Sequence, residues 1–437
     1  MQEQIKVEAQ SLSVELTALR REFHRYAEPA WMEMRTTSRI AQELKQMGYE
    51  EVLLGDEVCL DTARMGVPDR SLLNEHYRWA EQNGADTEFL PYTAGGFTGV
   101  VAYLRCGEGP TVALRFDIDA LGVCECVEEG HRPHDEGFSS MVSGVMHACA
   151  HDGHIAIGLG TAKLLMQHRS KLHGTVKLIF QPAEEGVRGS RAIVERGHLD
   201  DVDFALGAHI FPMDKAPGNE VAVFAEGGRG ALATTKWDVI FHGKAVHAAI
   251  APQEGNNAML AAATATLNLH AIPRYSSVPT HVNVGRFTAG TGRNVVCETA
   301  KLEIEVRAAT SEANTYMEKR ATAVVEAAAQ MYGCSVEIVP MGGAPAMESS
   351  WSLAERVQDI ARKQGYCATA LASMDGGSED FSYMARRVIE RGGKATFFSL
   401  LTPCAAINHN DRFDFVEAIL PVGVEVFTCT VLDIMGE

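Results

Sequence analysis

Residues 175–186 read TVKLIFQPAEEG, an apolar run followed at once by the acidic pair Glu184-Glu185. The run is rich in β-forming residues and is followed by Pro, which predicts a buried strand that ends just before the two glutamates. Two other apolar runs also end in ionisable residues: TVALRF precedes Asp117-Ile118-Asp119, and DFALGAHI contains His209. In open α/β sheets ligands bind beyond the carboxyl ends of the strands, so we expect the three runs to deliver these groups to one edge.

The order of strands and helices predicts two kinds of domain. From Gly96 onward strand and helix patterns alternate, which favours an α/β domain with a mostly parallel sheet covered by helices. Between residues 229 and 342 the order changes to β-α-β-β-α-β, the ferredoxin-like α+β arrangement. We therefore predict a catalytic domain formed by residues 1–228 and 343–437, into which residues 229–342 are inserted as a lid or dimerisation domain.

The N-terminal part carries fewer strand signals. The first 50 residues are expected to form two amphipathic helices, and Gly48 is expected to end the second. Residues 55–95 are polar and irregular, and one helix is expected near residues 72–84. This stretch has the character of an insertion.

Composition excludes several classes of partner. The formal net charge of −18 argues against nucleic acid and against an anionic membrane surface. The N-terminus, MQEQIKVEAQSL, has no basic start followed by an apolar run, and no apolar run of 18 residues occurs, so neither a signal peptide nor a membrane span is expected.

The ten cysteines are scattered along a large chain. This usage favours a reducing compartment and buried thiols over a disulfide framework, so we expect a cytoplasmic protein. Cys124 and Cys126 form a C-x-C pair that has the spacing of a metal site, but no second pair lies nearby.

The stretch HACAHDGH, residues 147–154, offers the densest set of potential metal ligands. Cys149 and His151 lie just before an apolar helix and can turn to one metal ion from a helix entrance. The alternative is a buried thiol beside a histidine that caps the helix. His147 and His154 are expected to support the site rather than to bind metal.

The glutamate pair divides naturally between two tasks. Adjacent side chains on an extended segment point in different directions, so one of Glu184 and Glu185 can bind metal while the other faces a water molecule as a general base. The alternative is a solvated acidic turn. Asp119 is a candidate for orienting a metal-bound histidine. His409, in a loop after the last strand, is a candidate for the remaining ligand.

These motifs together resemble a known family. HACAHDGH, FQPAEEG, His209, HGKAVHAA (242–249), GRNVV (292–296), GSED (377–380) and NHNDRFDF (408–415) are similar to motifs of the aminoacylase/carboxypeptidase-type metallopeptidases, in the branch of N-acyl amino acid and auxin-conjugate amidohydrolases. The resemblance extends from about residue 15 to residue 430.

The resemblance implies a site with two divalent metal ions per subunit, Mn²⁺ or Zn²⁺. It implies that Glu184 is the general base and that Asp119 supports a ligand. The implied metal ligands are Cys149, His151, Glu185, His209 and His409.

The resemblance also assigns residues of the inserted domain. His247 is expected to stabilise the oxyanion in the site of a partner subunit, although the sequence alone would favour a surface histidine. Asn294 is expected to contact the substrate carboxylate, and Arg293 and Arg307 are candidates for pairing with a glutamate substrate. The partner is either a second copy or a homologous subunit, bound through the lid domain.

The expected reaction is hydrolysis of the amide bond of an N-acyl amino acid, with p-aminobenzoyl-glutamate or a folate fragment as the expected substrate. One alternative is a broad hippurate or N-acetyl amino acid hydrolase, and another is a non-catalytic or regulatory subunit. The chain departs from the family pattern at Ala150, where glycine is usual, and in AAIN (405–408) before the last histidine. An alanine restricts φ at that turn.

Overall fold

The computed structural model describes residues 2–213, 222–224, 230–366 and 377–436. The chain divides into two compact units. Unit 1 comprises Met1–Arg229, Glu348–Ser373 and Asp380–Glu437, and unit 2 comprises Gly230–Met347 and Met374–Glu379. The catalytic role of the first unit and the lid or dimerisation role of the second stay predictions.

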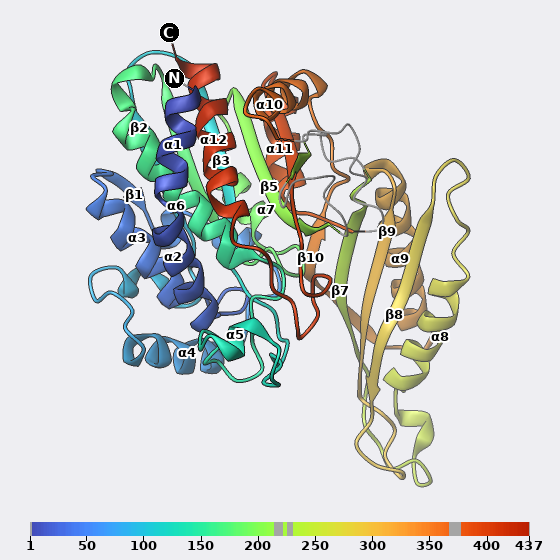
Figure 1. The fold of residues 1–437 in the computed structure, drawn as a ribbon. Coiled ribbons are helices and arrows are strands. Elements are labelled where there is room, and N and C mark those ends of the chain that lie inside the picture. The colour runs from blue at the N-terminus through green and yellow to red at the C-terminus, as the bar shows by residue number, and fades with distance from the viewer. Residues whose placement is uncertain (1, 214–221, 225–229, 367–376, 437) are drawn as a thin grey trace. The chain divides into compact units, whose positions relative to one another are not determined.

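Unit 1 is built on a seven-stranded sheet whose central strands β4, β3, β5 and β11 are parallel (Figure 1). Shorter antiparallel strands complete both edges. The predicted α/β class with a mainly parallel sheet is therefore confirmed. In sheet order the strands are β1 (Glu51–Leu53), β2 (Val100–Arg105), β4 (Thr175–Gln181), β3 (Thr111–Asp117), β5 (Phe204–Pro212), β11 (Lys394–Thr402) and β6 (Ala222–Phe224).

Helices cover both faces of this sheet. On one face α6 (His151–Gln167), α10 (Trp351–Lys363) and α12 (Ile419–Met435) pack on the strands, and α1 (Gln2–Ser11), α2 (Ser13–Arg25) and α3 (Met34–Gln46) pack around them. On the other face lie α7 (Ser190–Glu195) and α11 (Phe381–Glu390). The helices α4 (Arg70–Gln82) and α5 (Arg132–Asp135) belong to long loops.

Close packing of α6 on the sheet depends on a glycine. A Cβ atom at Gly158 would lie 2.6 Å from the ring of Phe180 and 2.8 Å from that of Phe116. The missing side chain lets α6 pack closely on strands β3 and β4. This close packing helps to position the first turn of α6, which contains the end of the HACAHDGH stretch, relative to the strand ends.

The two helices expected in the first 50 residues form as α2 and α3, but a further helix, α1, that was not expected precedes them. The chain breaks at Leu12 between α1 and α2. Ile5 and Ala9 of α1 are fully buried, so tertiary packing sustains a helix of ten residues that would be marginal alone.

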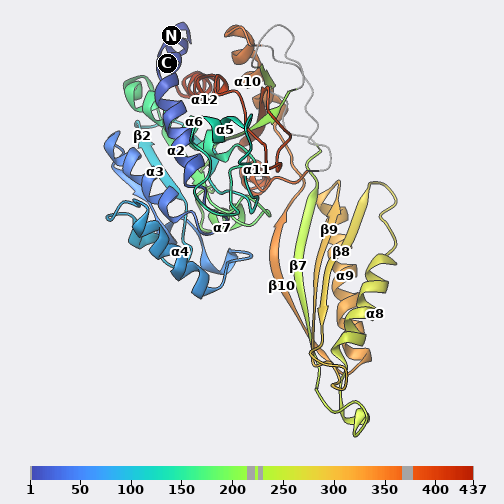
Figure 2. The same ribbon diagram turned by 60° about the horizontal axis from the view of Figure 1, so that its bottom comes forward.

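Unit 2 follows the β-α-β-β-α-β order as predicted. Its sheet has the order β10-β7-β9-β8 with every neighbouring pair antiparallel, and both helices cover one face (Figure 2). The elements are β7 (Ala233–His242), α8 (Ala258–His270), β8 (Thr280–Ala289), β9 (Thr299–Ala308), α9 (Ser311–Met331) and β10 (Ser335–Ala344). Among the described residues, no helix combines the length and apolarity needed to cross a membrane.

Candidate metal centre

Three neighbouring strands of unit 1 bring their ionisable residues to one edge of the sheet. Strands β3 and β4 run parallel, with Asp117 opposite Gln181, so Asp119 and the Glu184-Glu185 turn leave the sheet side by side. His209 lies in β5, which pairs with β3. Two loops add the rest: the backbone N–H of His409 donates to the carbonyl of Ala148 at 2.7 Å, beside Cys149.

The potential ligand atoms at this edge form overlapping groups, in each of which all atoms lie within 4.8 Å of one another. One group contains Cys149, His151 and His209, and a second contains Cys149, Glu185 and His409. A third joins His151 with Glu184 and Glu185. The structure thus brings together every residue that the resemblance names as a ligand or as the base.

The two central histidines present the same ring nitrogen to the cluster. His151 donates from Nδ1 to the backbone carbonyl of Asp119 at 2.8 Å, and His209 donates from Nδ1 to the carbonyl of Ile210 at 2.7 Å. Both Nε2 atoms are therefore free to act as ligands, the arrangement usual around protein-bound metals. His209 Nε2 lies 3.3 Å from Cys149 Sγ.

Two atoms of the cluster are left without a hydrogen bond although they are buried. They are His151 Nε2 and Glu185 Oε1, which have no hydrogen-bond partner among the described residues. Buried polar atoms are normally paired, so these orphaned atoms fit a group that binds between them. One sulfur donor, imidazole nitrogens and carboxylate oxygens together suit a divalent ion such as Zn²⁺ or Mn²⁺.

Cys149 needs a cation to act as a thiolate. Burial, reinforced by the charge of Glu185, raises the pKa of its thiol to about 12. The side-chain amide of Asn408 also donates to Cys149 Sγ at 3.4 Å. Asn408 was not identified from the sequence, where its only signal is its position directly before His409.

The turn that carries the two glutamates is held by buried carboxylates. Asp119 accepts hydrogen bonds from the backbone N–H groups of Glu184 at 3.0 Å and Glu185 at 2.9 Å. Glu33 accepts the preceding N–H, that of Ala183, at 2.7 Å. Three successive amides are thus fixed from outside the turn. Asp119 therefore contacts the site through the glutamate backbone as well as through His151.

A group of buried, mutually paired ionisable side chains adjoins the metal-binding cluster. His154 donates from Nδ1 to Asp117 and accepts the backbone N–H of Ile210 on Nε2 at 2.9 Å, so both of its ring nitrogens are occupied. Arg115 pairs with Asp117 at 2.6 Å and with Asp380 at 3.1 Å. His154 therefore supports the site, and the pairing of Arg115 with Asp117 and Asp380 is a contact that the sequence did not reveal.

The start of α6 is anchored by a buried ion network. Arg20 of α2 is fully buried and its guanidinium lies 2.8 Å from Asp152, 2.9 Å from Asp414 and 3.3 Å from Glu417. His24 also contacts Asp152, at 2.8 Å. These contacts bridge the residue after His151 to the segment after His409, so they hold the two loops of the centre together.

The departure at Ala150 has a structural counterpart. Ala150 precedes α6 with φ 65° and ψ 12°, in the left-handed region that L-residues rarely adopt. The predicted restriction of φ therefore falls on a residue between two ligand candidates. His409 is also left-handed, with φ 68°.

The predicted residues of unit 2 fall in two places. His247 and Asn294 are exposed and lie on adjacent bridged segments, where the N–H of Ala248 donates to the carbonyl of Asn294 at 2.9 Å. Arg293 is exposed next to them. Arg307 lies eight residues along β9 from Thr299, about 26 Å at ~3.3 Å per residue, and its guanidinium is 3.0 Å from Glu305. Arg307 therefore lies near the end of β9 that is remote from the segment entering the strand after Asn294, and its pairing with a substrate carboxylate stays a prediction.

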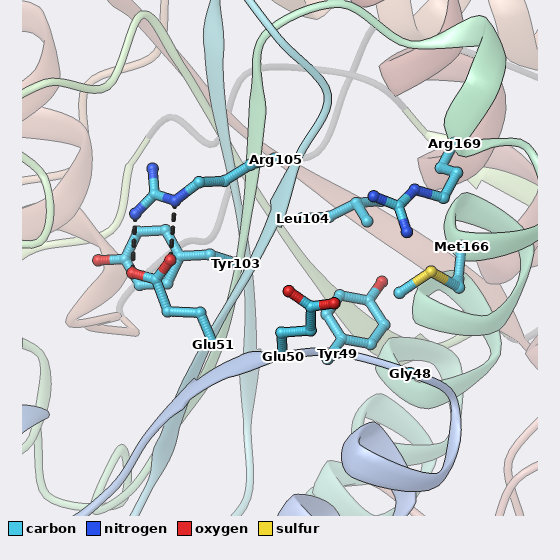
Figure 3. Close-up of a pocket in the computed structure, with 9 residues that line it drawn as sticks. All are labelled: Gly48, Tyr49, Glu50, Glu51, Tyr103, Leu104, Arg105, Met166 and Arg169. Carbon is cyan, nitrogen blue, oxygen red and sulfur yellow. Dashed lines mark hydrogen bonds and ion pairs between the residues drawn. The ribbon is translucent and has the colours of Figure 1, made fainter.

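Two other features are separate from the centre. Cys124 and Cys126 belong to no group of three or more potential ligand residues in the part of the chain that the structure describes, and Cys367 lies outside that part. A surface hollow of about 100 Å³ occurs near the β1 edge of the sheet (Figure 3), where Arg105 pairs with Glu51 at 2.7 Å. None of its lining residues belongs to the metal-binding cluster.

Comparison with known proteins identifies relatives along nearly the whole chain. The model of peptidase family M20/M25/M40 matches residues 113–433. One subunit of the p-aminobenzoyl-glutamate hydrolase of Escherichia coli (strain K12) is 44% identical over 426 residues, which cover 97% of this chain and 96% of that protein. The indole-3-acetyl-aspartic acid hydrolase of Enterobacter agglomerans is 43% identical, with 96% and 95% covered.

Solved structures are also similar to this chain over nearly its whole length. The aminobenzoyl-glutamate utilization protein from Klebsiella pneumoniae superposes with a TM-score of 0.82 at 38% identity, covering 98% of each chain. A dinuclear metal-binding M20 peptidase from Bacillus subtilis gives a TM-score of 0.66 at 26% identity, covering 98% of this chain and 99% of that one.

Proposed function

Because this chain belongs to peptidase family M20/M25/M40 and is a metal-dependent hydrolase, we propose that it cleaves the amide bond of p-aminobenzoyl-glutamate to p-aminobenzoate and glutamate. The observation that carries the proposal is the convergence of Cys149, His151, His209 and the two glutamates at the carboxyl ends of the parallel strands. A relative named for this reaction shares 44% of its residues over nearly the whole chain.

The metal-binding residues of the proposed site are Cys149, His151, Glu185, His209 and His409. When two Mn²⁺ or Zn²⁺ ions are bound, they supply an acidified water and polarise the amide carbonyl. Burial holds the pKa of His209 well below its usual value and lowers that of His409, so these two rings are suited to bind a cation in their neutral form.

Glu184 is the proposed general base. Its carboxylate lies 3.9 Å from His151 Nε2 and is largely buried, so it faces the ligand cluster rather than solvent. It takes the proton of the attacking water and delivers it to the leaving amine nitrogen, the usual double role of such a carboxylate.

His247 is the proposed donor to the oxyanion. Its Nδ1 accepts the backbone N–H of Ala249 at 3.2 Å, which leaves the proton of the neutral ring on Nε2. An exposed ring with a free N–H suits stabilisation of developing negative charge in the site of a partner subunit. We propose that this partner is a second copy or a homologous subunit, and that Asn294 and Arg293 beside His247 contact the substrate carboxylate.

The direct test is turnover by the purified chain alone, loaded with Mn²⁺ or Zn²⁺, on p-aminobenzoyl-glutamate, hippurate and an N-acetyl amino acid. We expect release of p-aminobenzoate, with a higher kcat/KM for p-aminobenzoyl-glutamate than for the other two, and about two divalent ions per chain by metal analysis. Equal turnover of all three would establish the broad hydrolase instead. Absence of turnover that a homologous subunit restores would establish a non-catalytic subunit.

A cytoplasmic location stays a prediction from the dispersed cysteines. A role in the breakdown of folate fragments follows from the proposed substrate and depends on it.

A further inference from the structure

The turn that carries the glutamate pair also carries an arginine. Arg188 follows Glu185 by three residues, and its backbone N–H donates to the carbonyl of Ala183 at 3.0 Å, so the turn folds back on itself. Gly186 (φ 86°) and Val187 (φ 58°) are both left-handed and make this reversal possible. The backbone of position 188 is thereby brought back beside the start of the turn that carries the glutamates.

The guanidinium of Arg188 lies directly over Gly186. A Cβ atom built on Gly186 would be 2.6 Å from Arg188 Nε and 3.1 Å from Nη2. Any larger residue at 186 would displace the arginine. The positive charge is thus packed against the backbone of the residue next to Glu185, at the half-buried rim of the turn.

Arg188 has no acidic partner within ion-pair distance among the described residues. Among the described residues its guanidinium makes one hydrogen bond, from Nη1 to the carbonyl of Gly66 at 3.3 Å, which is long, and its buried Nε has no acceptor. By contrast, Arg20 and Arg115, which are more deeply buried, each contact at least two carboxylates. A partly buried guanidinium without an anion is costly unless a ligand supplies one.

The contact on the other side of Arg188 is itself well supported. Gly66 follows Met65, whose carbonyl accepts the Nε1–H of the fully buried Trp31 at 2.8 Å. Arg64 donates to the carbonyls of Gly95 and Gly96, at 3.0 and 2.9 Å. The 55–95 insertion thus contacts the guanidinium of Arg188 through the carbonyl of Gly66, in a segment that is itself held by hydrogen bonds.

From this geometry we propose that Arg188 is a subsite for the side-chain carboxylate of the amino acid released by hydrolysis, so that the enzyme selects conjugates of glutamate or aspartate. The proposal rests on the proposed function, because it names the part of that substrate that Arg188 binds. An unpaired guanidinium matches a carboxylate in bidentate geometry. The two relatives at 44% and 43% identity are named for a glutamate and an aspartate conjugate, which share a second carboxylate.

The test compares p-aminobenzoyl-glutamate with p-aminobenzoyl-glutamine, which keeps the shape of the side chain and the α-carboxylate but lacks the second charge. Arg188→Gln is expected to lower kcat/KM for the glutamate conjugate at least about 30-fold, mainly through KM, as expected for loss of a charged partner. The glutamine conjugate should change less than about threefold. Arg191→Gln, at an exposed arginine three residues further on, is the matched control and should behave as the wild type.

An equal loss on both conjugates would overturn the proposal, because Arg188 would then hold the turn or the α-carboxylate. No loss on either conjugate would also overturn it. Arg188→Lys keeps the positive charge but loses the two parallel N–H donors of the guanidinium. Its kcat/KM for the glutamate conjugate should lie between those of Arg188→Gln and the wild type. Metal content measured on each variant shows whether the centre itself has survived the substitution.

Binding of free glutamate and free glutamine to the metal-loaded protein, measured by calorimetry, separates this subsite from the proposed function. If the wild type cleaves neither conjugate, the proposed function fails. Tighter binding of glutamate than of glutamine, lost in Arg188→Gln, would still support the subsite. Equal binding of both amino acids to the wild type would overturn it.

Discussion

The buried carboxylate of Glu33 accepts the backbone N–H of Ala183 at 2.7 Å, and so holds the turn before Glu184 from a segment about 150 residues earlier in the chain. Ala183 itself is left-handed, with φ 53°. The position of the base therefore depends on a residue far from the catalytic motif. Burial, reinforced by the nearby charge of Asp119, raises the pKa of Glu33 to about 8.

This pKa predicts a pH-dependent contribution to stability. As pH rises from 4.5 to about 8, the unfolded chain releases the Glu33 proton while the folded chain keeps it, so the free energy of unfolding falls by up to about 1.4 kcal/mol per pH unit. Glu33→Gln cannot ionise. Urea unfolding of both proteins between pH 5 and 8.5 should show the variant gaining on the wild type as pH rises. A difference that stays constant with pH would show that Glu33 does not titrate in this window.

Removing the proton acceptor from the site should abolish most activity. Glu184→Gln keeps the size of the side chain and the backbone hydrogen bond to Asp119, so metal content should be retained. We expect kcat to fall by about 10²–10⁴-fold, the usual contribution of a positioned base. Glu15→Gln, an exposed glutamate paired with Lys163, is a suitable control. Full activity in Glu184→Gln would remove this residue from the mechanism.

Metal binding should become tighter with rising pH. The Cys149 thiol, with a pKa of about 12 in the metal-free protein, must lose its proton to become a ligand. Affinity for Zn²⁺, measured by competition with a chelator between pH 6 and 8, should therefore rise at least about tenfold per pH unit. Cys149→Ser should bind more weakly and with a shallower pH dependence. Equal slopes for the two proteins would argue that the thiol does not bind the metal.

The buried network around Arg20 should dominate stability near the centre. Arg20→Met removes the fully buried cation that joins Asp152, Asp414 and Glu417, and leaves the buried Asp152 with His24 as its remaining partner, a loss that typically costs about 3–5 kcal/mol. The neighbouring Arg21 pairs with Glu136 and Glu417 near the surface, and Arg21→Met should cost about 1 kcal/mol or less. Similar urea midpoints for the two variants would contradict the assignment of the network.

Ala150 offers a sharp test of backbone strain. A buried alanine replaced by glycine normally loses about 1 kcal/mol or more, and Ala156→Gly inside α6 should do so. At Ala150 the left-handed φ of 65° costs an L-residue about 1–2 kcal/mol, and glycine relieves it. Ala150→Gly should therefore be nearly neutral in thermal unfolding. A loss as large as that of Ala156→Gly would show that no strain is stored at this position.

The sequence predicted the site best where ionisable residues directly follow or end a strand. Hydrophobic runs predicted β3, β4 and β5, and the rule that parallel strands share one carboxyl edge was enough to group Asp119, the glutamate pair and His209. His409 was reachable only by elimination and by resemblance. Its loop has no periodicity, and it is held beside Cys149 by the backbone hydrogen bond to Ala148 and by the hydrogen bond from Asn408 to Cys149.

The contacts that hold the centre could not be predicted, since they join distant parts of the chain through single side chains. Arg20 lies in a charged helical stretch, RREFHR, that has the pattern of a solvated face, yet it is fully buried. The break between α1 and α2 carries no glycine or proline to mark it. Arg188 follows a motif whose glutamates carry the obvious chemistry, and its orientation depends on two left-handed residues before it.

Strand β11 pairs with β5 inside the sheet, and His409 follows that strand. During synthesis, a chain that has not yet reached residue 402 therefore presents an open edge on β5 and lacks one ligand candidate. Such a nascent or truncated chain cannot close the sheet and cannot complete the centre. Loss of the C-terminal segment from β11 onward should accordingly yield a protein that aggregates or is degraded, rather than one that is folded with a weaker site.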